Sequence, residues 1–207
     1  MISAFKRSIF NRRSDISGER GATSIMFVGI IFFLIVVALV LALFLGDAVA
    51  DRRNANTASD SAALAGAGYC ADKIEANYKE ALVAPDGPTF WAHFGRPVSQ
   101  YCGGAAVEAS SYANRNGATL TSYVPLSGLR YRATVRMKDP VEDSSWKLTS
   151  KATAQISMSR GTCVKHGLLG VAAEGRCLTS PAARGGNTNR PVINDYKAVV
   201  KVKLVDT

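Results

Sequence analysis

The chain has 207 residues, of which 47% are apolar and 20% charged, and its formal net charge is +9 at pH 7. About 160 residues lie outside the basic leader and the longest apolar stretch, which is enough for one folded domain with its own core. With only two histidines, and without a GxSxG, HExxH or phosphate-binding glycine motif, the composition offers no catalytic constellation.

The longest apolar stretch covers residues 25–45, twenty-one positions without a charge. At about 1.5 Å per helical residue it extends roughly 31 Å, the thickness of the hydrocarbon core of a bilayer. This length predicts a transmembrane helix over residues 22–46. Because helix-forming residues continue and no proline occurs until Pro85, the same helix is expected to run on through residues 47–84.

Charges on the two sides of the stretch predict its orientation. Five cations precede it, namely Lys6, Arg7, Arg12, Arg13 and Arg20, whereas Asp47 and Asp51 follow it. The positive-inside rule then predicts a single-pass protein of the cell membrane, with residues 1–21 as a cytoplasmic leader and residues 85–207 as an extracytoplasmic domain. The alternative is a cleaved secretory signal ending at Ala48-Val49-Ala50, but its apolar core would be shorter.

The four cysteines all fall on the predicted extracytoplasmic side: Cys70, Cys102, Cys163 and Cys177. An even number of exported cysteines predicts two disulfides, for which three pairings exist. Cys70 with Cys102 and Cys163 with Cys177 are favoured because each pair closes a local loop. A metal site or redox pair is the alternative, but there is no CxxC motif and His166 is the only imidazole nearby.

Two stripes can be drawn on the helix beyond the membrane. Small residues suited to close packing against another helix are Ala48, Ala55, Ala58, Ala62 and Ala65, although helix propensity alone also explains an alanine run. A second stripe, expected to face the protein's own sheet, is Ala63, Ala67, Cys70, Ile74, Tyr78 and Leu82. Gly66 and Gly68 would favour a kink.

The remaining residues predict an α+β domain. Residues 85–104 contain three prolines and are expected to form an irregular loop anchored by aromatic residues, and residues 105–116 form a short helix. Strict alternation predicts strands at 118–124, 129–138, 146–159 and 196–205, joined as an antiparallel sheet with one wet face. Residues 160–194 are interpreted as a disulfide-closed excursion.

The wet face would carry many cations, among them Arg130, Arg132, Arg136, Lys138, Lys147 and Lys151. Such a face could bind DNA, an anionic polysaccharide or a lipid surface. A solvated strand face is the simpler explanation, because aromatic residues for base stacking are not interleaved with the charges. His93 is interpreted as structural, since no metal-ligating residue stands near it at a suitable spacing. No cofactor or metal is expected.

The N-terminal pattern resembles a known family. It consists of Glu19-Arg20-Gly21-Ala22, the apolar helix, Asp47, and residues 56–67, NTASDSAALAGA. It is similar to TadE/TadG-like proteins of the tight-adherence (Tad, Flp) pilus system, which resemble pseudopilins. The resemblance implies a pilin-like fold, with the long helix packed on a small sheet, and Gly21-Ala22 as the processing site. A processed pilin would carry Glu where this chain has Met26, so a retained anchor fits better.

The resulting functional hypothesis is a membrane-anchored, pseudopilin-like component of Tad pilus assembly or secretion. It would act through helix packing and protein contacts, with membrane lipid and other pilin-like subunits as partners, and not as an enzyme. The alternative is a membrane-tethered binding module for DNA or another anionic polymer, using the basic sheet face.

Overall fold

The structure, a computed structural model, describes residues 19–141 and 145–206, and within the first helix the side chains of 19–24 and 42–48 lie outside the described set. The chain divides into two compact units, Met1–Val49 and Ala50–Thr207. The elements in chain order are α1 (Glu19–Leu82), α2 (Gly87–Trp91), the 3-10 helix η1 (Val98–Cys102), α3 (Ala105–Arg115), β1 (Ala118–Leu126), β2 (Arg130–Met137), β3 (Thr149–Arg160), β4 (Thr162–Lys165), β5 (Leu168–Ala173), β6 (Arg176–Leu178), the 3-10 helix η2 (Pro181–Arg184) and β7 (Val199–Val205).

The described part of the first unit is helical throughout and belongs to α1. Every side chain from 25 to 41 is exposed, including large apolar groups such as Phe32 (67%) and Leu34 (59%). Across the described residues, no helix meets both the length and the apolar character needed to cross a membrane.

Four strands of the second unit form an antiparallel sheet in the order β1-β2-β3-β7. This confirms the α+β class. Apolar and polar residues alternate along the strands, which gives the sheet one buried and one exposed face. On β2, Tyr131, Ala133 and Val135 are buried, whereas Arg132 and Arg136 alternate with them and point to the opposite face. We call that opposite face of the sheet the outer face.

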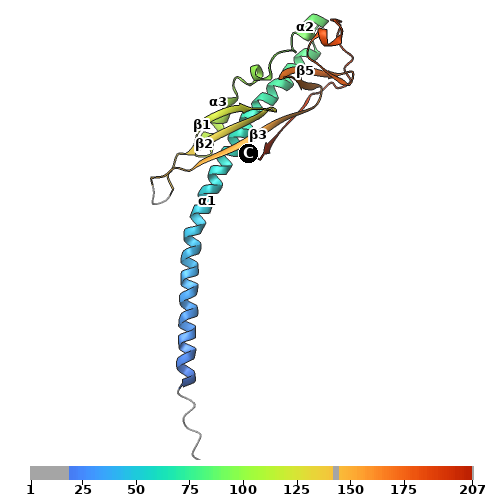
Figure 1. Ribbon diagram of the computed structural model, residues 1–207. Helices are drawn as coiled ribbons and strands as arrows, with labels where there is room; N and C mark the ends of the chain where they lie inside the picture. Colours follow the sequence, from blue (N-terminus) through green and yellow to red (C-terminus); the bar gives the residue numbers. More distant parts are fainter. Residues whose placement is uncertain (1–18, 142–144, 207) are drawn as a thin grey trace, which may run out of the picture. The chain divides into compact units, whose positions relative to one another are not determined.

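The inner face packs against α1 and α3 (Figure 1). The buried cluster joins Ala58, Ala62, Ala63 and Ala67 of α1 to three alanines of α3 and to apolar residues of β1, β2 and β3. Small side chains on both helices allow their backbones to come close. A hydrogen bond from Asn116 Nδ2 to Ser61 Oγ, 2.9 Å long, joins the end of α3 to α1.

Aromatic rings lie directly over two glycines in this region. A Cβ atom on Gly66 would be 2.5 Å from Cζ of Tyr123, and one on Gly104 would be 2.4 Å from Cζ of Tyr69. These distances are too short for real contacts. The close approach of Tyr123, rather than a kink, therefore accounts for Gly66 in the middle of α1.

A second buried cluster surrounds the C-terminal part of α1. Ile74 and Tyr78 pack there with Phe90 and Trp91 of α2 and with residues of a three-stranded sheet in the order β4-β5-β6. Figure 1 shows α2 and β5 near one another within the second unit. An isolated bridge between Pro97 and Leu168 joins the aromatic loop to β5.

Two segments contain more regular structure than the sequence suggests. Residues 85–104 contain α2, whose start is capped by Asp86 accepting a 2.8 Å hydrogen bond from the amide of Thr89, and η1. Residues 160–194 contain β4, β5 and β6. The disulfide expected to close this segment is present between Cys163 and Cys177, and the segment also contains short hairpins that the sequence did not predict.

Candidate functional site

The outer face of the four-stranded sheet carries most of the predicted basic residues. Arg130, Arg132 and Arg136 lie at its outward positions on β2, and Lys151 lies on β3 opposite Thr134. Lys201 and Lys203 continue the face on β7, where they are paired with Ser157 and Gln155. The sequences of β1, β2, β3 and β7 contain no Asp or Glu, so this face is positive without internal compensation.

The cations of this face are not equivalent. Arg130 donates from Nε to the Ser127 carbonyl at 3.0 Å, and Arg132 donates from Nε to Thr153 Oγ1 at 3.3 Å. The Arg130 guanidinium is therefore held by the turn between β1 and β2, and that of Arg132 by the neighbouring strand β3. Within the described parts of the chain, the ion pairs are those of Glu174, and none involves the predicted basic residues.

Three of the predicted cations converge on a surface hollow at one end of the sheet. Its volume is about 530 Å³ and its lining comprises Thr119, Thr121, Arg136, Met137, Lys138, Ser145 and Lys147. We call it the basic hollow. Lys138 directly follows β2 and Lys147 precedes β3, so the connection between these strands brings both lysines beside Arg136. Glu142 and Asp143, expected in this turn, lie outside the described residues.

Sequence reasoning missed the hydroxyl groups of the basic hollow. Thr119 is paired with Arg136 across β1 and β2, and Thr121 occupies the irregularity between Leu120 and Ser122 in β1. Thr121 Oγ1 donates to the Thr134 carbonyl at 3.0 Å. The alternation of β1 could have placed Thr119 on the outer face, whereas the position of Thr121 depends on a bulge that has no signature in the sequence.

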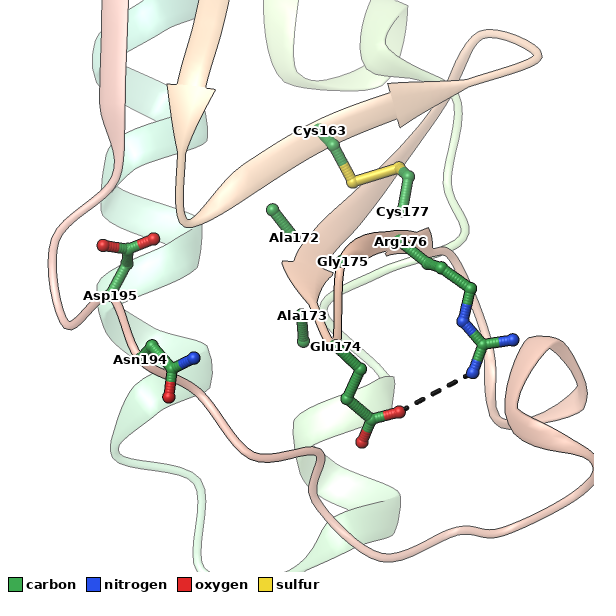
Figure 2. A pocket seen from close by; sticks show the side chains of 9 residues that line it. All are labelled: Cys163, Ala172, Ala173, Glu174, Gly175, Arg176, Cys177, Asn194 and Asp195. Atoms are coloured by element: carbon green, nitrogen blue, oxygen red, sulfur yellow. Dashed lines mark ion pairs between the residues drawn. A yellow bond between two sulfur atoms is a disulfide. The ribbon is translucent and has the colours of Figure 1, made fainter.

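A second hollow, of about 350 Å³, lies beside the disulfide between Cys163 and Cys177 (Figure 2). Glu174 and Arg176 reach toward one another at its edge, with a 3.8 Å ion pair. Arg184 donates to Glu174 Oε1 at 2.7 Å, and this hydrogen bond is the main reason why the pKa of Glu174 is lowered. A carboxylate held ionised by two arginines is a structural group rather than a general acid or base.

A third hollow, of about 520 Å³, lies between α1 and η1 and is lined partly by Tyr69, Lys73, Tyr101 and Gly104. The ammonium group of Lys73 lies 5.4 Å from the ring centroid of Tyr69. Burial raises the pKa of Tyr101, whose hydroxyl donates to the His93 carbonyl at 3.0 Å. Tyr69, Lys73 and Tyr101 thus each have a partner within the chain, and the rest of the lining includes Asn77, Glu80 and Gln100.

The two histidines have different surroundings. His93 Nδ1 is 3.1 Å from Asn77 Oδ1, and Asn77 Nδ2 donates to the His93 carbonyl, so this imidazole is fixed against α1. His166 occupies a turn with a φ of 52°. In the part of the chain that the structure describes, no three His, Cys, Asp or Glu residues are grouped to hold a metal ion.

All four cysteines are paired, Cys70 with Cys102 and Cys163 with Cys177, which are the two pairings favoured from the sequence. The first disulfide joins α1 to η1, and the second joins β4 to β6 across β5. The hydroxyl of Tyr131 donates to Cys102 Sγ at 3.2 Å. Both bonds therefore serve as structural links.

The predicted packing stripe is largely occupied within the chain. Ala55, Ala58 and Ala62 are at most 2% exposed, and Ala58 and Ala62 lie in one cluster with the alanines of α3. Ala65 stays partly exposed, and the side chain of Ala48 lies outside the described residues. The predicted processing residues Gly21 and Ala22 lie in α1, and their side chains too are outside that set.

The geometry defines an α+β protein whose clearest surface feature is a positive sheet face, with no grouping of catalytic side chains in the described residues. Residues 21–69 match the model of the Flp pilus-assembly TadE/G-like family. This match confirms the resemblance to Tad pilus-assembly proteins over the N-terminal pattern. The comparisons with curated proteins and with solved structures gave no match.

Proposed function

We propose that the protein is a single-pass, membrane-anchored component of Tad pilus assembly that acts through protein contacts rather than catalysis. The observation that carries the proposal is the TadE/G-like match over residues 21–69, which includes the apolar part of α1 and the alanine-rich part that packs in the second unit. The match joins the proposed anchor and the folded domain in one family pattern.

Residues 25–45, which contain no charge, support the anchor. All described side chains from 25 to 41 are exposed around the helix, and a helix that is apolar on all sides requires an apolar surrounding. The side chains of 42–45 complete the stretch and lie outside the described set. A bilayer is the surrounding that a stretch of this length fits.

Charge distribution and cysteine chemistry support the proposed orientation. The cations before residue 21 favour a cytoplasmic N-terminus. Both disulfides lie in the second unit, where an oxidising extracytoplasmic compartment would preserve them. Other pilin-like subunits are the proposed partners. Since Met26 stands where processed pilins carry Glu, Gly21-Ala22 stays uncut in this proposal and the leader is retained.

The anchor is tested by placing charges in it. Leu34→Asp combined with Val37→Asp should release the full chain from membranes during alkaline carbonate extraction, because each charge at a bilayer centre costs roughly 3 kcal/mol. The matched control is Asn54→Asp with Thr57→Asp, which adds the same charges at exposed positions of the same helix. Wild-type protein found entirely in the soluble fraction would overturn the proposal.

The alternative of a tethered module for DNA or another anionic polymer is supported by the acid-free outer face. It is weaker because the outward positions of these strands carry no aromatic residue on which bases could stack. Charge reversal at Arg130, Arg132 and Arg136 tests it, and polymer binding that survives the reversal would exclude this face.

A further inference from the structure

We infer that the free edge of β7 binds an extended acidic segment of another protein, which joins the sheet as a further strand. The segment carries acidic residues at every second position and apolar residues between them. Only residues of the second unit take part, so this contact goes beyond the proposed function and does not depend on the anchor.

The backbone of β7 presents unused hydrogen-bonding groups at this edge. In the order β1-β2-β3-β7, β3 is the only described strand that pairs with β7. The amide of Val200 donates to Glu75 Oε1 at 3.3 Å and so points away from β3, whereas the Lys201 carbonyl accepts from a serine of β3. Backbone groups alternate in direction along a strand, so those of Val202 and Leu204 also point to the free edge.

The opposite edge of the sheet is less suited to a partner strand. Its strand, β1, has an irregular register between Leu120 and Ser122 and contains Pro125, which has no amide to donate. From residue 200 to its end, β7 contains neither proline nor glycine, and its register with β3 is regular. An edge without these protections is open to strand addition.

The side chains of β7 determine which segment fits. Lys201 and Lys203 are exposed on the outer face, where they are paired with uncharged residues of β3. On the inner face, Val202 packs against the core and Leu204 is 40% exposed. Directly opposed residues of neighbouring strands share a face, and opposite charges stabilise such a pair. Acidic side chains beside the two lysines, alternating with apolar side chains beside Val202 and Leu204, therefore complement this edge.

A second copy of this chain cannot supply such a strand from the edges of its four-stranded sheet, because β1 and β7 contain no Asp or Glu. If β7 paired antiparallel with β7 of a second copy over its full length, Lys201 would stand opposite Lys203. Like charges directly opposite one another are destabilising. The lysines thus disfavour self-association while leaving the edge open to an acidic strand of a different protein.

The experiment titrates the full chain, in micelles of a neutral detergent, into a fluorescently labelled, acetylated VEVEVEV peptide and measures anisotropy. The control peptide VVVVEEE has the same composition without the alternation. We expect VVVVEEE to bind at least about tenfold more weakly, because only the alternating peptide can present its acids on one face of a strand.

Hydrogen exchange followed by NMR tests the backbone contact. Exchange of the Val202 and Leu204 amides should slow when VEVEVEV binds, because the added strand accepts their hydrogen bonds. The amides of Lys201 and Lys203 point to β3 and serve as the internal reference, since the peptide does not reach them.

The charge is tested by Lys201→Glu with Lys203→Glu. This variant should bind VEVEVEV about tenfold more weakly and should instead bind VKVKVKV. The matched control is Lys138→Glu with Lys147→Glu, which reverses two exposed cations of the basic hollow. It should leave the binding of VEVEVEV nearly unchanged at physiological salt, where exposed charges act only over short distances. Unchanged circular dichroism in both variants shows that the fold is retained.

The remaining outcomes contradict the added strand. Equal binding of VEVEVEV and VVVVEEE, or binding without slower exchange at Val202 and Leu204, would show general attraction of acids to a positive surface. The absence of binding would overturn the contact as well. Slow exchange of both amides in the free chain, together with a dimer in analytical ultracentrifugation, would assign the edge to a second copy. Membrane extraction tests the anchor separately, so failure of this contact leaves the proposed function standing.

Discussion

At the scale of single residues, two glycines of α1 have opposite surroundings. A Cβ on Gly66 would meet the ring of Tyr123, whereas a Cβ on Gly68 would meet no described atom within 4 Å apart from its own stretch of helix. The Tyr123 ring cannot move aside freely, because it stacks on Tyr131 with 5.8 Å between centroids and 10° between planes. Among the described residues, its buried hydroxyl has no hydrogen-bond partner.

Gly66→Ala should therefore lower the free energy of unfolding by about 1–3 kcal/mol through overpacking. Gly68→Ala should instead raise it by up to about 1 kcal/mol, because alanine is the better helix former and has room there. Urea unfolding of both variants measures the difference. Tyr123→Val should rescue Gly66→Ala in a double-mutant cycle, and equal effects at the two glycines would contradict the close approach of the ring.

At the scale of elements, most alanines in the C-terminal part of α1 pack in the core of the second unit. Ala62 is fully buried among the alanines of α3 and the sheet, while Ala65, three residues further along the same helix, is partly exposed. Part of the family match, residues 21–69, thus coincides with the core face of the second unit. Packing within one chain is therefore sufficient to explain the buried alanines of this pattern, without a second subunit.

Ala62→Leu should destabilise the second unit by about 1–3 kcal/mol, because the added atoms have no space between α1 and α3. Ala65→Leu adds the same atoms on a partly exposed face and should change stability by no more than about 0.5 kcal/mol. Thermal unfolding compares the two. If both variants unfold like the wild type, α3 does not pack on α1 as closely as the structure has it.

The sheet and α3 could be predicted because their signals are local. The sequence shows the alternation along β2 and β3, and it shows Asn116-Gly117 after α3. The observed ends of these elements differ from the predicted ends by only one or a few residues. The hairpins β4-β5-β6 were missed because their strands have only four, six and three residues. Both residues of each turn, His166-Gly167 and Glu174-Gly175, have positive φ, as in two-residue hairpin turns. These dipeptides were the sequence signal from which the hairpins could have been predicted.

The candidate site was predictable only in part. Alternation places Arg136 on the outer face, but it does not show that Arg130 is held by a hydrogen bond to the β1–β2 turn and Arg132 by one to β3. The gathering of Lys138 and Lys147 around Arg136 depends on how the connection between β2 and β3 closes. Backbone hydrogen bonds determine how this connection closes, and no periodic pattern in the sequence predicts which residues they join.

At the scale of the whole second unit, the C-terminal segment is tied to α1 by long-range hydrogen bonds. The Tyr78 hydroxyl donates to the Asp195 carbonyl at 2.5 Å, the amide of Val200 donates to Glu75 Oε1 at 3.3 Å, and Arg190 donates to the carbonyls of Leu82 and Ala84. These contacts close the fold by holding the segment that leads into β7 against the helix.

The Tyr78 contact gives this closure a pH dependence. Burial, with a further contribution from the negative charge of Asp195, raises the pKa of Tyr78 from 10.0 to about 12. Since the folded state holds the proton more tightly than the unfolded state, the stabilisation is fully present below pH 10 and is lost as the pH rises through about 12. Ionised Tyr78 could no longer donate to the Asp195 carbonyl.

Tyr78→Phe should lower the free energy of unfolding by about 1 kcal/mol below pH 10, because the Asp195 carbonyl loses its donor. It should also flatten the decline in stability between pH 10 and about 12, so that wild type and variant converge at the upper end of that window. Urea unfolding across this pH range measures both effects. Tyr196→Phe, at a side chain that is 79% exposed, is the matched control and should follow the wild type. Parallel curves for wild type and Tyr78→Phe would show that the closure of the C-terminal segment on α1 does not depend on the Tyr78 proton.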